Sequence, residues 1–360
     1  MDPYLQTFCR EHLNIKLGDK IKDTPGKQVY FGTSDSEEVV FKTHALCGLK
    51  HPVASQTPDY LSLSVKYDPE YYCLLSFVRE GNRYTFSLDD NDFKDSKIVP
   101  DSMREKEALQ LCENVEGVPS LLSSGYLIGN NVFSLYSLYP KIGNDNIKKT
   151  LDKVFLENRL DNLLPLQKRF RIISELIDIQ KKLSVRKISH NDISPRNILL
   201  GEQDKVYLTD FAFADFFKEM ENPFFTSGQK GWWYGTPAYS SPERMHKNRD
   251  VFSVGIIAYE LLLGFNPLLT FYNPIRIKRY APLYRPRHQD FLIKYFREVT
   301  RTTTKDPESG YFSLNNDDLK IIFKEDFTHR FLAAVGEAIE IDPDKRNLSK
   351  LEQLAKEMSQ

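Results

Sequence analysis

The chain has 360 residues, of which 41% are hydrophobic, and its 49 Lys and Arg nearly balance its 50 Asp and Glu. This composition is that of an ordinary globular enzyme, long enough to bury one large core or two smaller ones. A formal net charge of −1 provides no global field to hold a polyanion, so nucleic acid is not expected as a partner. No run reaches the roughly 18 apolar residues of a membrane span, and the start lacks the pattern of a secretory leader.

The cysteines point to a reducing compartment. They stand at positions 9, 47, 73 and 112 and form no C-x-x-C pair. Four such residues are too few to staple a chain of this length, so we expect free thiols in the cytoplasm and neither a disulfide framework nor a zinc site.

Short runs of β-type residues dominate the chain before about residue 140. The predicted strands are 28–31, 39–42, 72–77 and 131–136, and the third belongs to a predicted hairpin near 72–87. One predicted helix, 102–115, interrupts them, and its Ser-x-x-Glu start is a capping-box pattern. The first part of the chain is therefore expected to be a small β-rich lobe.

After about residue 140 the pattern becomes helical. One face of a predicted helix carries apolar residues at spacings of 4, 3 and 4, namely Leu166, Phe170, Ile173 and Ile177. A hairpin is predicted for 198–200 and 206–208, and residues 254–263 are apolar on nearly every side, which predicts a buried helix. The fold class is therefore expected to be α+β, with a larger helical lobe after the β-rich one and a ligand cleft between them.

Three polar residues around the predicted hairpin form a pattern suited to metal ions and phosphate. Asp192 is followed five positions later by Asn197, and Asp210 follows the second hairpin strand. Such a set offers one base and two oxygen ligands for a hard cation such as Mg²⁺. Taken alone, a loop with Asp and Asn is equally a turn or a helix cap.

Seven short motifs in chain order accompany this pattern. They are Val39-Val40-Phe41-Lys42, Glu105 with Gly117-Val118-Pro119, His190-Asn191-Asp192 with Asn197, Asp210-Phe211-Ala212, the segment 235–243, the segment 250–255, and Asp342-Pro343-Asp344-Lys345-Arg346. In this order they make the chain resemble the eukaryotic-type protein kinase superfamily. The resemblance implies a two-lobed kinase-like fold with an N-lobe over 1–138 and a C-lobe over 139–360. It also requires an insertion between the third strand and the C-helix, and a second one around 268–332 in the C-lobe, which also carries the catalytic loop and the activation segment.

The resemblance assigns roles to the polar residues. Asp192 would accept or orient the proton of the attacking hydroxyl, and Asn197 and Asp210 would hold Mg²⁺, or Mn²⁺ in its place. Lys42 would pair with the α- and β-phosphates of ATP, and adenine would lie near Leu135 and Leu138. The plain alternatives are loop caps for the three polar residues and an ordinary strand-edge lysine for Lys42.

The carboxylate that holds Lys42 has two candidates. The resemblance favours Glu105 at the start of the C-helix. Ser102, three residues earlier, could instead use Glu105 to cap the helix. Glu107 would then be the partner of Lys42.

The match is poorest at the glycine-rich loop that covers the phosphates. Residues 23–29 keep a single glycine, so Gly26 and Val29 are the candidate nucleotide contacts there. Pro25 stiffens the turn and removes a backbone donor, which predicts weak nucleotide affinity.

Two other positions depart from the family pattern. Asn191 replaces the usual Arg before the catalytic Asp, so regulation by a phosphate docked on that Arg is not expected. Ala212 replaces the Gly of the metal-binding triplet and restricts its backbone.

The implied activity is transfer of the γ-phosphate of ATP to Ser or Thr of a protein substrate. Thr236 resembles the Ser/Thr class, whereas Arg196 stands where many tyrosine kinases carry Arg. The alternatives are a pseudokinase that binds nucleotide or acts as a scaffold, and a small-molecule phosphotransferase.

A basic run could dock a partner or be a solvated face; it comprises Arg276, Lys278, Arg279, Arg285 and Arg287.

Overall fold

The computed structural model describes residues 3–24, 27–35, 37–48, 74–79, 82–87, 98–129, 132–142, 149–155, 164–217, 235–236, 238–241, 246–263, 266, 325–340 and 342–359. The chain divides into two compact units. The N-terminal unit is Met1–Glu113 with Ser120–Lys141, and the C-terminal unit is Asn114–Pro119 with Ile142–Gln360. No helix in these described ranges is long and apolar enough to cross a membrane.

A five-stranded antiparallel sheet forms the N-terminal unit. Its strands are β1 (Lys16–Thr24), β2 (Lys27–Ser34), β3 (Glu37–Gly48), β6 (Ser123–Gly129) and β7 (Val132–Pro140), in the order β1-β2-β3-β7-β6. The predicted strands 28–31 and 39–42 are confirmed in β2 and β3, and the predicted strand 131–136 corresponds to β7. The hairpin predicted near 72–87 is also confirmed, as β4 (Leu74–Arg79) paired with β5 (Asn82–Ser87).

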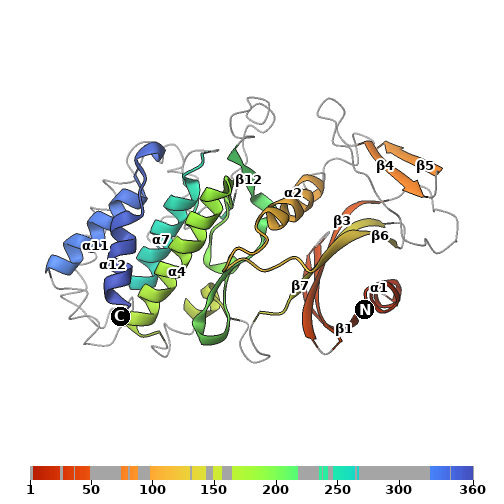
Figure 1. Ribbon diagram of the computed structural model, residues 1–360, viewed down its shortest axis with the longest axis horizontal. Helices are drawn as coiled ribbons and strands as arrows, with labels where there is room; N and C mark the ends of the chain where they lie inside the picture. Colours follow the sequence, from red (N-terminus) through yellow and green to blue (C-terminus); the bar gives the residue numbers. More distant parts are fainter. Residues whose placement is uncertain are drawn as a thin grey trace, which may run out of the picture. The chain divides into compact units, whose positions relative to one another are not determined.

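One face of the large sheet packs against helix α1 (Pro3–His12) (Figure 1). The helix presents Leu5 and Cys9, four residues apart, to the sheet. Their buried neighbours are Ile15, Leu17, Tyr30, Val39, Phe41, Tyr136 and Leu138. Phe41 and Tyr136 stack with ring centroids 5.8 Å apart. This face is therefore a closed apolar core.

Helix α2 (Ile98–Leu111) packs against β3. Because side chains alternate along a strand, Phe41 faces α1 and its neighbour Lys42 faces α2. The predicted helix start at Ser102 is wrong. The helix begins one turn earlier, since Pro100 is compatible with a first turn, and it ends at Leu111.

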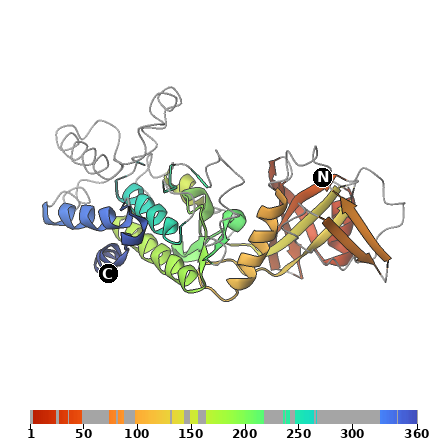
Figure 2. The ribbon, with the colours of Figure 1, turned by 90° about the horizontal axis from the view of Figure 1, so that it is seen from above.

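Helices form most of the described C-terminal unit. α4 (Leu166–Val185) packs against α7 (Arg249–Leu263) and α12 (Ser349–Met358), and α11 (Glu325–Ala338) packs against α7 and α12 (Figures 1 and 2). The predicted apolar face of α4 and the predicted buried helix in α7 are confirmed. Gly255 lets α7 approach α11 closely, because a Cβ there would lie 2.7 Å from the Cβ of Ala338.

Short strands position the loops of the C-terminal unit. β10 (Ile198–Leu200) and β11 (Val206–Leu208) form the predicted hairpin, and β8 (Lys149–Thr150) joins β10. β9 (Ile188–Ser189) pairs with β12 (Asp215–Phe216). The loop after β9 and the loop after β11 therefore lie close together, and they carry Asp192 and Asp210.

Candidate active site

Asp192 is held at both carboxylate oxygens. Its Oδ1 accepts hydrogen bonds from the backbone N–H of Thr236 at 2.6 Å and from the Thr236 hydroxyl at 2.8 Å. Its Oδ2 accepts from Nδ2 of Asn197 at 2.8 Å. Donors on two sides fix the orientation of this carboxylate before any substrate arrives.

Burial raises the pKa of Asp192 above the usual value of an aspartate, and the hydrogen bonds from Thr236 and Asn197 oppose that rise. The effect of burial is the larger of the two, so the pKa is raised and the carboxylate is a stronger base than an exposed one. A stronger base accepts a proton more readily, which suits the role that the family resemblance assigns to Asp192, orienting an attacking hydroxyl.

Gly235 allows Thr236 to approach Asp192. Its φ is +78°, and a Cβ there would lie 2.4 Å from the backbone oxygen of Asn191 and 3.1 Å from Oδ1 of Asp192. A side chain at this position would both strain the backbone and clash with the loop.

His190 supports the loop that carries Asp192. The ring is fully buried, accepts from the backbone N–H of Asp192 through Nδ1 at 3.2 Å, and has Nε2 3.1 Å from the backbone oxygen of Thr209. These contacts assign the hydrogen to Nε2, which donates to that oxygen. The ring also packs edge-on against the ring of Phe211, with the two ring centroids 4.5 Å apart. His190 therefore ties Asp192 to the residue after Asp210.

Asn197 and Asp210 have the chemistry of a magnesium site. Nδ2 of Asn197 donates to Asp192, so its Oδ1 is the amide atom left to bind a cation. Thr209, next to Asp210, donates to the backbone oxygen of Asn197 through its N–H at 2.8 Å and its hydroxyl at 3.1 Å. These contacts hold the loop of Asn197 and the loop of Asp210 together. Among the described residues, no cluster of three His, Cys, Asp or Glu side chains forms a metal site, and Mg²⁺ needs none, because phosphate and water complete its shell.

The triplet Asp210-Phe211-Ala212, to which the family resemblance assigns metal binding, has one left-handed residue. Asp210 has φ +65°, a region that Asp tolerates better than most residues. Ala212 lies outside the left-handed region. Alanine in place of glycine therefore causes no strain in this conformation.

Lys42 and Glu105 form a buried ion pair in the N-terminal unit. Nζ of Lys42 lies 2.5 and 2.6 Å from the two carboxylate oxygens, and both side chains are less than a tenth exposed. Nε2 of His44 lies 3.7 Å from Oε2 of the same carboxylate. Glu107 is exposed. The structure thus brings Lys42 to Glu105, and the early start of α2 leaves Ser102 inside the helix instead of at its cap.

The two residues expected to contact adenine, Leu135 and Leu138, lie on opposite faces of the sheet. Val29 and Ser137 lie opposite Lys42 in the neighbouring strands, and Leu135 lies opposite His44, so all three share the face of Lys42. Leu138 instead lies in the core beneath α1. Gly26 lies outside the described residues, as do the basic run 276–287 and the activation-segment residues 218–234.

Asp250 and Ser253 of α7 hold the backbone of residues 190–191 and of Tyr239. Their signal in the sequence is a polar side chain within an otherwise apolar helix. Asp250 accepts from the backbone N–H of His190 at 2.6 Å and of Asn191 at 2.8 Å. Ser253 donates to the backbone oxygen of Tyr239 at 2.9 Å. The family resemblance marked this helix but did not identify what these side chains hold.

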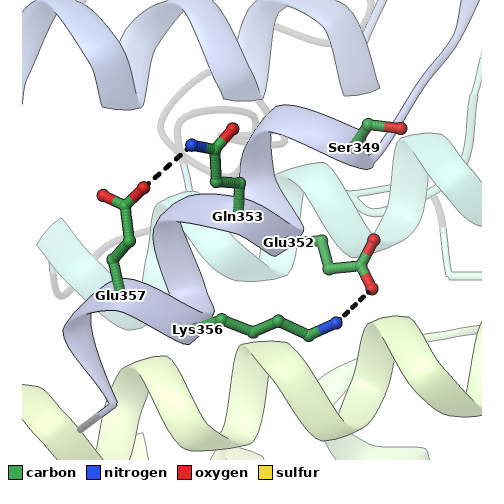
Figure 3. A pocket seen from close by; sticks show the side chains of 5 residues that line it. All are labelled: Ser349, Glu352, Gln353, Lys356 and Glu357. Atoms are coloured by element: carbon green, nitrogen blue, oxygen red, sulfur yellow. Dashed lines mark hydrogen bonds and ion pairs between the residues drawn. The ribbon is translucent and has the colours of Figure 1, made fainter.

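A groove along α12 lies outside the candidate site. It is lined by Ser349, Glu352, Gln353, Lys356 and Glu357 (Figure 3). Within the helix, Nζ of Lys356 lies 2.8 Å from Glu352, and Nε2 of Gln353 donates to Glu357 at 2.9 Å. The two glutamates also pair with neighbouring helices, Glu352 with Lys181 of α4 and Glu357 with Arg330 of α11. None of the predicted site residues lines it.

Comparison with known proteins identifies the class. The profile of the protein kinase domain matches residues 149–330, half of the chain. The chain therefore belongs to the protein kinase family, and its α+β architecture is a protein kinase fold.

Several curated relatives are serine/threonine kinases by name. The chain is 28% identical over 240 residues to the putative serine/threonine-protein kinase R436 of Acanthamoeba polyphaga mimivirus, covering 64% of this chain and 77% of the relative. It is 31% identical over 153 residues to the cAMP-dependent protein kinase type 3 of Saccharomyces cerevisiae, covering 38% of this chain and 34% of the relative. The probable serine/threonine-protein kinase pknA2 of Bifidobacterium longum is 32% identical over 107 residues, 28% of this chain and 14% of the relative. The chain thus spans only part of these relatives.

Proposed function

We propose that the chain is an active protein kinase that transfers the γ-phosphate of ATP to Ser or Thr hydroxyls of a protein substrate. The observation that carries the proposal is the Asp192 carboxylate, oriented at both oxygens by Thr236 and Asn197. A scaffold that transfers no phosphate has no need of an oriented base with a raised pKa.

Asp192 acts on the substrate hydroxyl. Its deprotonated carboxylate accepts a hydrogen bond from the hydroxyl, aligns the oxygen with the γ-phosphorus and takes up the proton as the new bond forms. Phosphoryl transfer depends mainly on positioning and charge stabilisation, so the fixed orientation matters as much as the basicity.

Asn197 and Asp210 would hold Mg²⁺ or Mn²⁺ through carbonyl and carboxylate oxygens. The bound cation neutralises charge on the transferring phosphoryl group. Lys42 would bind the α- and β-phosphates, and Glu105 keeps the extended lysine in place.

Two observations support Ser or Thr as the acceptor. The Thr236 hydroxyl bonds Asp192, as the threonine of the resembled Ser/Thr class bonds its catalytic loop, and the relatives above are Ser/Thr kinases by name. Cys9 and Cys112 form no disulfide bond, which is compatible with a cytoplasmic enzyme.

A pseudokinase is the second candidate, because residues 23–29 contain only one glycine to close over phosphates. Transfer and binding must therefore be measured separately.

The test compares wild type with Asp192→Asn and Asp210→Asn. Each is incubated with γ-labelled ATP, Mg²⁺ or Mn²⁺ and a generic basic protein, and labelled residues are located by mass spectrometry. Asp204→Asn is the matched control, since Asp204 has φ +61°, close to the +65° of Asp210, and lies in the turn between β10 and β11.

Label on Ser or Thr that is lost in both site variants and kept in the control supports the proposal. Label on Tyr overturns the acceptor assignment. ATP binding, measured separately, without any transfer establishes a pseudokinase. A parallel assay offers an aminoglycoside or choline as the acceptor, and label on that compound alone establishes a small-molecule phosphotransferase.

A further inference from the structure

Lys27, the first residue of β2, lies on the same face of the sheet as Lys42. Tyr30 lies in the core beneath α1, and its hydroxyl donates to Oε1 of Gln28 at 3.0 Å, so these two side chains share the face of α1. Lys27 and Val29 alternate with them along β2 and therefore belong to the other face, where Val29 lies opposite Lys42. Lys27 is partly exposed, so its amine can reach a ligand on that face.

Two other basic residues are close neighbours of Lys27. It lies directly opposite His44 of β3, and Lys42 is two residues before His44 on the same face. Residues opposite one another in antiparallel strands have Cβ atoms about 5 Å apart, and diagonal neighbours lie about 7–8 Å apart. Because both lysine side chains are long and flexible, their amines can contact the same polyphosphate chain.

Glu105 is the acidic partner of the two basic residues of β3. Its oxygens lie 2.5 and 2.6 Å from Nζ of Lys42, and Oε2 lies 3.7 Å from Nε2 of His44. The ion pair of Lys42 and Glu105 has no net charge, so Lys27 makes this group of residues positive overall. The face therefore attracts an anion at the end of the sheet where β1 turns into β2.

The turn between β1 and β2 has few backbone donors. Thr24 and Lys27 pair at its two ends, and Pro25 and Gly26 stand between them in the sequence. These two residues together have one backbone N–H, because proline has none. A loop with several glycines would present successive amides to phosphate. A lysine can supply the same attraction as a point charge.

We propose that Lys27 is a second phosphate-binding cation, which holds the polyphosphate of the nucleotide together with Lys42 and replaces the backbone amides of a glycine-rich loop. The inference rests on the proposed kinase function and adds a residue to its nucleotide site. Each further phosphate adds negative charge, so the contribution of Lys27 to affinity grows from adenosine to ADP to ATP.

Lys27→Met is the test variant, because methionine keeps an apolar stem and removes the charge. Isothermal titration calorimetry with Mg²⁺ measures the affinities for adenosine, ADP and ATP. Loss of one charge-assisted contact should weaken ATP binding roughly tenfold, and ADP binding less. Adenosine has no phosphate, so its affinity should stay within about twofold of wild type. Lys27→Arg keeps the charge and should bind ATP within about threefold of wild type.

Lys20→Met is the matched control. Lys20 belongs to β1 of the same hairpin, but its Nζ lies over the ring of Tyr30, 5.5 Å from the centroid, on the face of α1. The substitution changes the net charge of the protein by the same amount, and ATP affinity should stay within about twofold of wild type. Equal weakening of ATP binding in Lys20→Met and Lys27→Met would show a general effect of charge and would overturn the inference.

Salt and steady-state kinetics give two further measurements. Raising the salt concentration should narrow the difference in ATP affinity between wild type and Lys27→Met, because salt screens a partly exposed charge. In an active enzyme, Lys27→Met should raise KM for ATP roughly tenfold and leave KM for the protein substrate within about twofold. An unchanged KM for ATP would contradict the proposal.

Binding is measured without catalysis, so the two proposals fail separately. A wild-type protein that binds ATP more tightly than Lys27→Met but transfers no phosphate overturns only the proposed function. Transfer by wild type with equal ATP affinity in Lys27→Met overturns only the role of Lys27. If Lys27→Met has a lower melting temperature and binds adenosine as poorly as ATP, Lys27 supports the sheet instead of the phosphates, and the inference is wrong.

Discussion

Glu105 and Asp192 are both buried carboxylates, one in each unit, and they are held in different ways. Glu105 faces a full positive charge, with Nζ of Lys42 within 2.6 Å of both oxygens. Asp192 receives hydrogen bonds from neutral groups, the hydroxyl and N–H of Thr236 and the amide of Asn197.

The difference matches their proposed roles. An ion pair compensates the charge of Glu105 and fixes the lysine, which is what a structural partner must do. Neutral donors orient Asp192 but leave its negative charge less compensated, and burial keeps its pKa raised. A base that must take up a proton benefits from the second arrangement.

Lys42→Met should have the largest effect, because it leaves the buried Glu105 without its lysine partner. Breaking a buried ion pair on one side costs about 3–5 kcal/mol of unfolding free energy, and the lysine proposed to bind the phosphates of ATP is also lost. Urea denaturation and the labelled-ATP assay measure the two effects.

The double variant Lys42→Met with Glu105→Leu separates stability from activity. Replacing a buried pair by apolar side chains is often neutral or stabilising, so stability should return while activity does not. Glu107→Gln, an exposed change on the same helix, is the control. A Lys42→Met protein as stable as wild type would show that the pair carries no such energy.

Thr236→Val should have the next largest effect. It removes the hydroxyl donor to Asp192 and keeps the backbone N–H, so the rate should fall by roughly tenfold or more, as expected for losing one hydrogen bond to a charged group. Thr236→Ser, which keeps the hydroxyl, should remain close to wild type.

The same variant predicts a change in pH dependence. The Thr236 hydroxyl lowers the pKa of Asp192 against burial, so its loss raises that pKa further. In the proposed mechanism Asp192 must be deprotonated to act, so the rate should fall as the pH drops through its pKa. The acid limb of the rate profile should therefore move to higher pH in Thr236→Val. A limb that stays in place would mean that another group titrates there.

The contribution of Asp192 to the free energy of unfolding should change with pH in the opposite sense, decreasing as the pH rises. Because folding raises the pKa of Asp192, the folded state binds this proton more tightly than the unfolded state. The contribution of Asp192 to stability is therefore greatest at low pH and is lost as the pH rises through the folded pKa.

Elements with a strong local pattern were predictable from the sequence, and those that depend on their neighbours were not. The helix α4 and the hairpin 198–208 follow directly from the spacing of apolar residues. β1 was missed because Lys16–Thr24 is largely charged, and its strand conformation depends on pairing with β2. α1 was missed because its apolar face is short and becomes a clear signal only against the sheet.

The candidate site divides in the same way. Motif order indicated Asp192, Asn197 and Asp210. Identifying Glu105 rather than Glu107 as the partner of Lys42 requires knowing where α2 begins and which carboxylate Lys42 contacts. Both are seen only in the tertiary structure. Ser137 beside Lys42 depends on strand register, and a one-residue shift would move it to the opposite face.

Cys9 offers a local probe of the N-terminal unit. Its thiol is fully buried, and burial raises its pKa to about 12. Since the thiolate is the reactive form, alkylation of Cys9 should require opening of the N-terminal unit. Lys42→Met should therefore speed this alkylation, measured at Cys9 by mass spectrometry.

Gly255→Ala should have the smallest effect and should act on the other unit alone. The added Cβ would lie 2.7 Å from the Cβ of Ala338, so α7 and α11 must separate slightly. Overpacking costs about 1–3 kcal/mol, and the better helix propensity of alanine returns about 1 kcal/mol of it. Ala338→Gly in addition should relieve the clash.

If each unit has its own core, Gly255→Ala lowers the free energy of unfolding of the C-terminal unit and leaves the alkylation rate of Cys9 unchanged. Faster alkylation of Cys9 in Gly255→Ala would show instead that the two units unfold together.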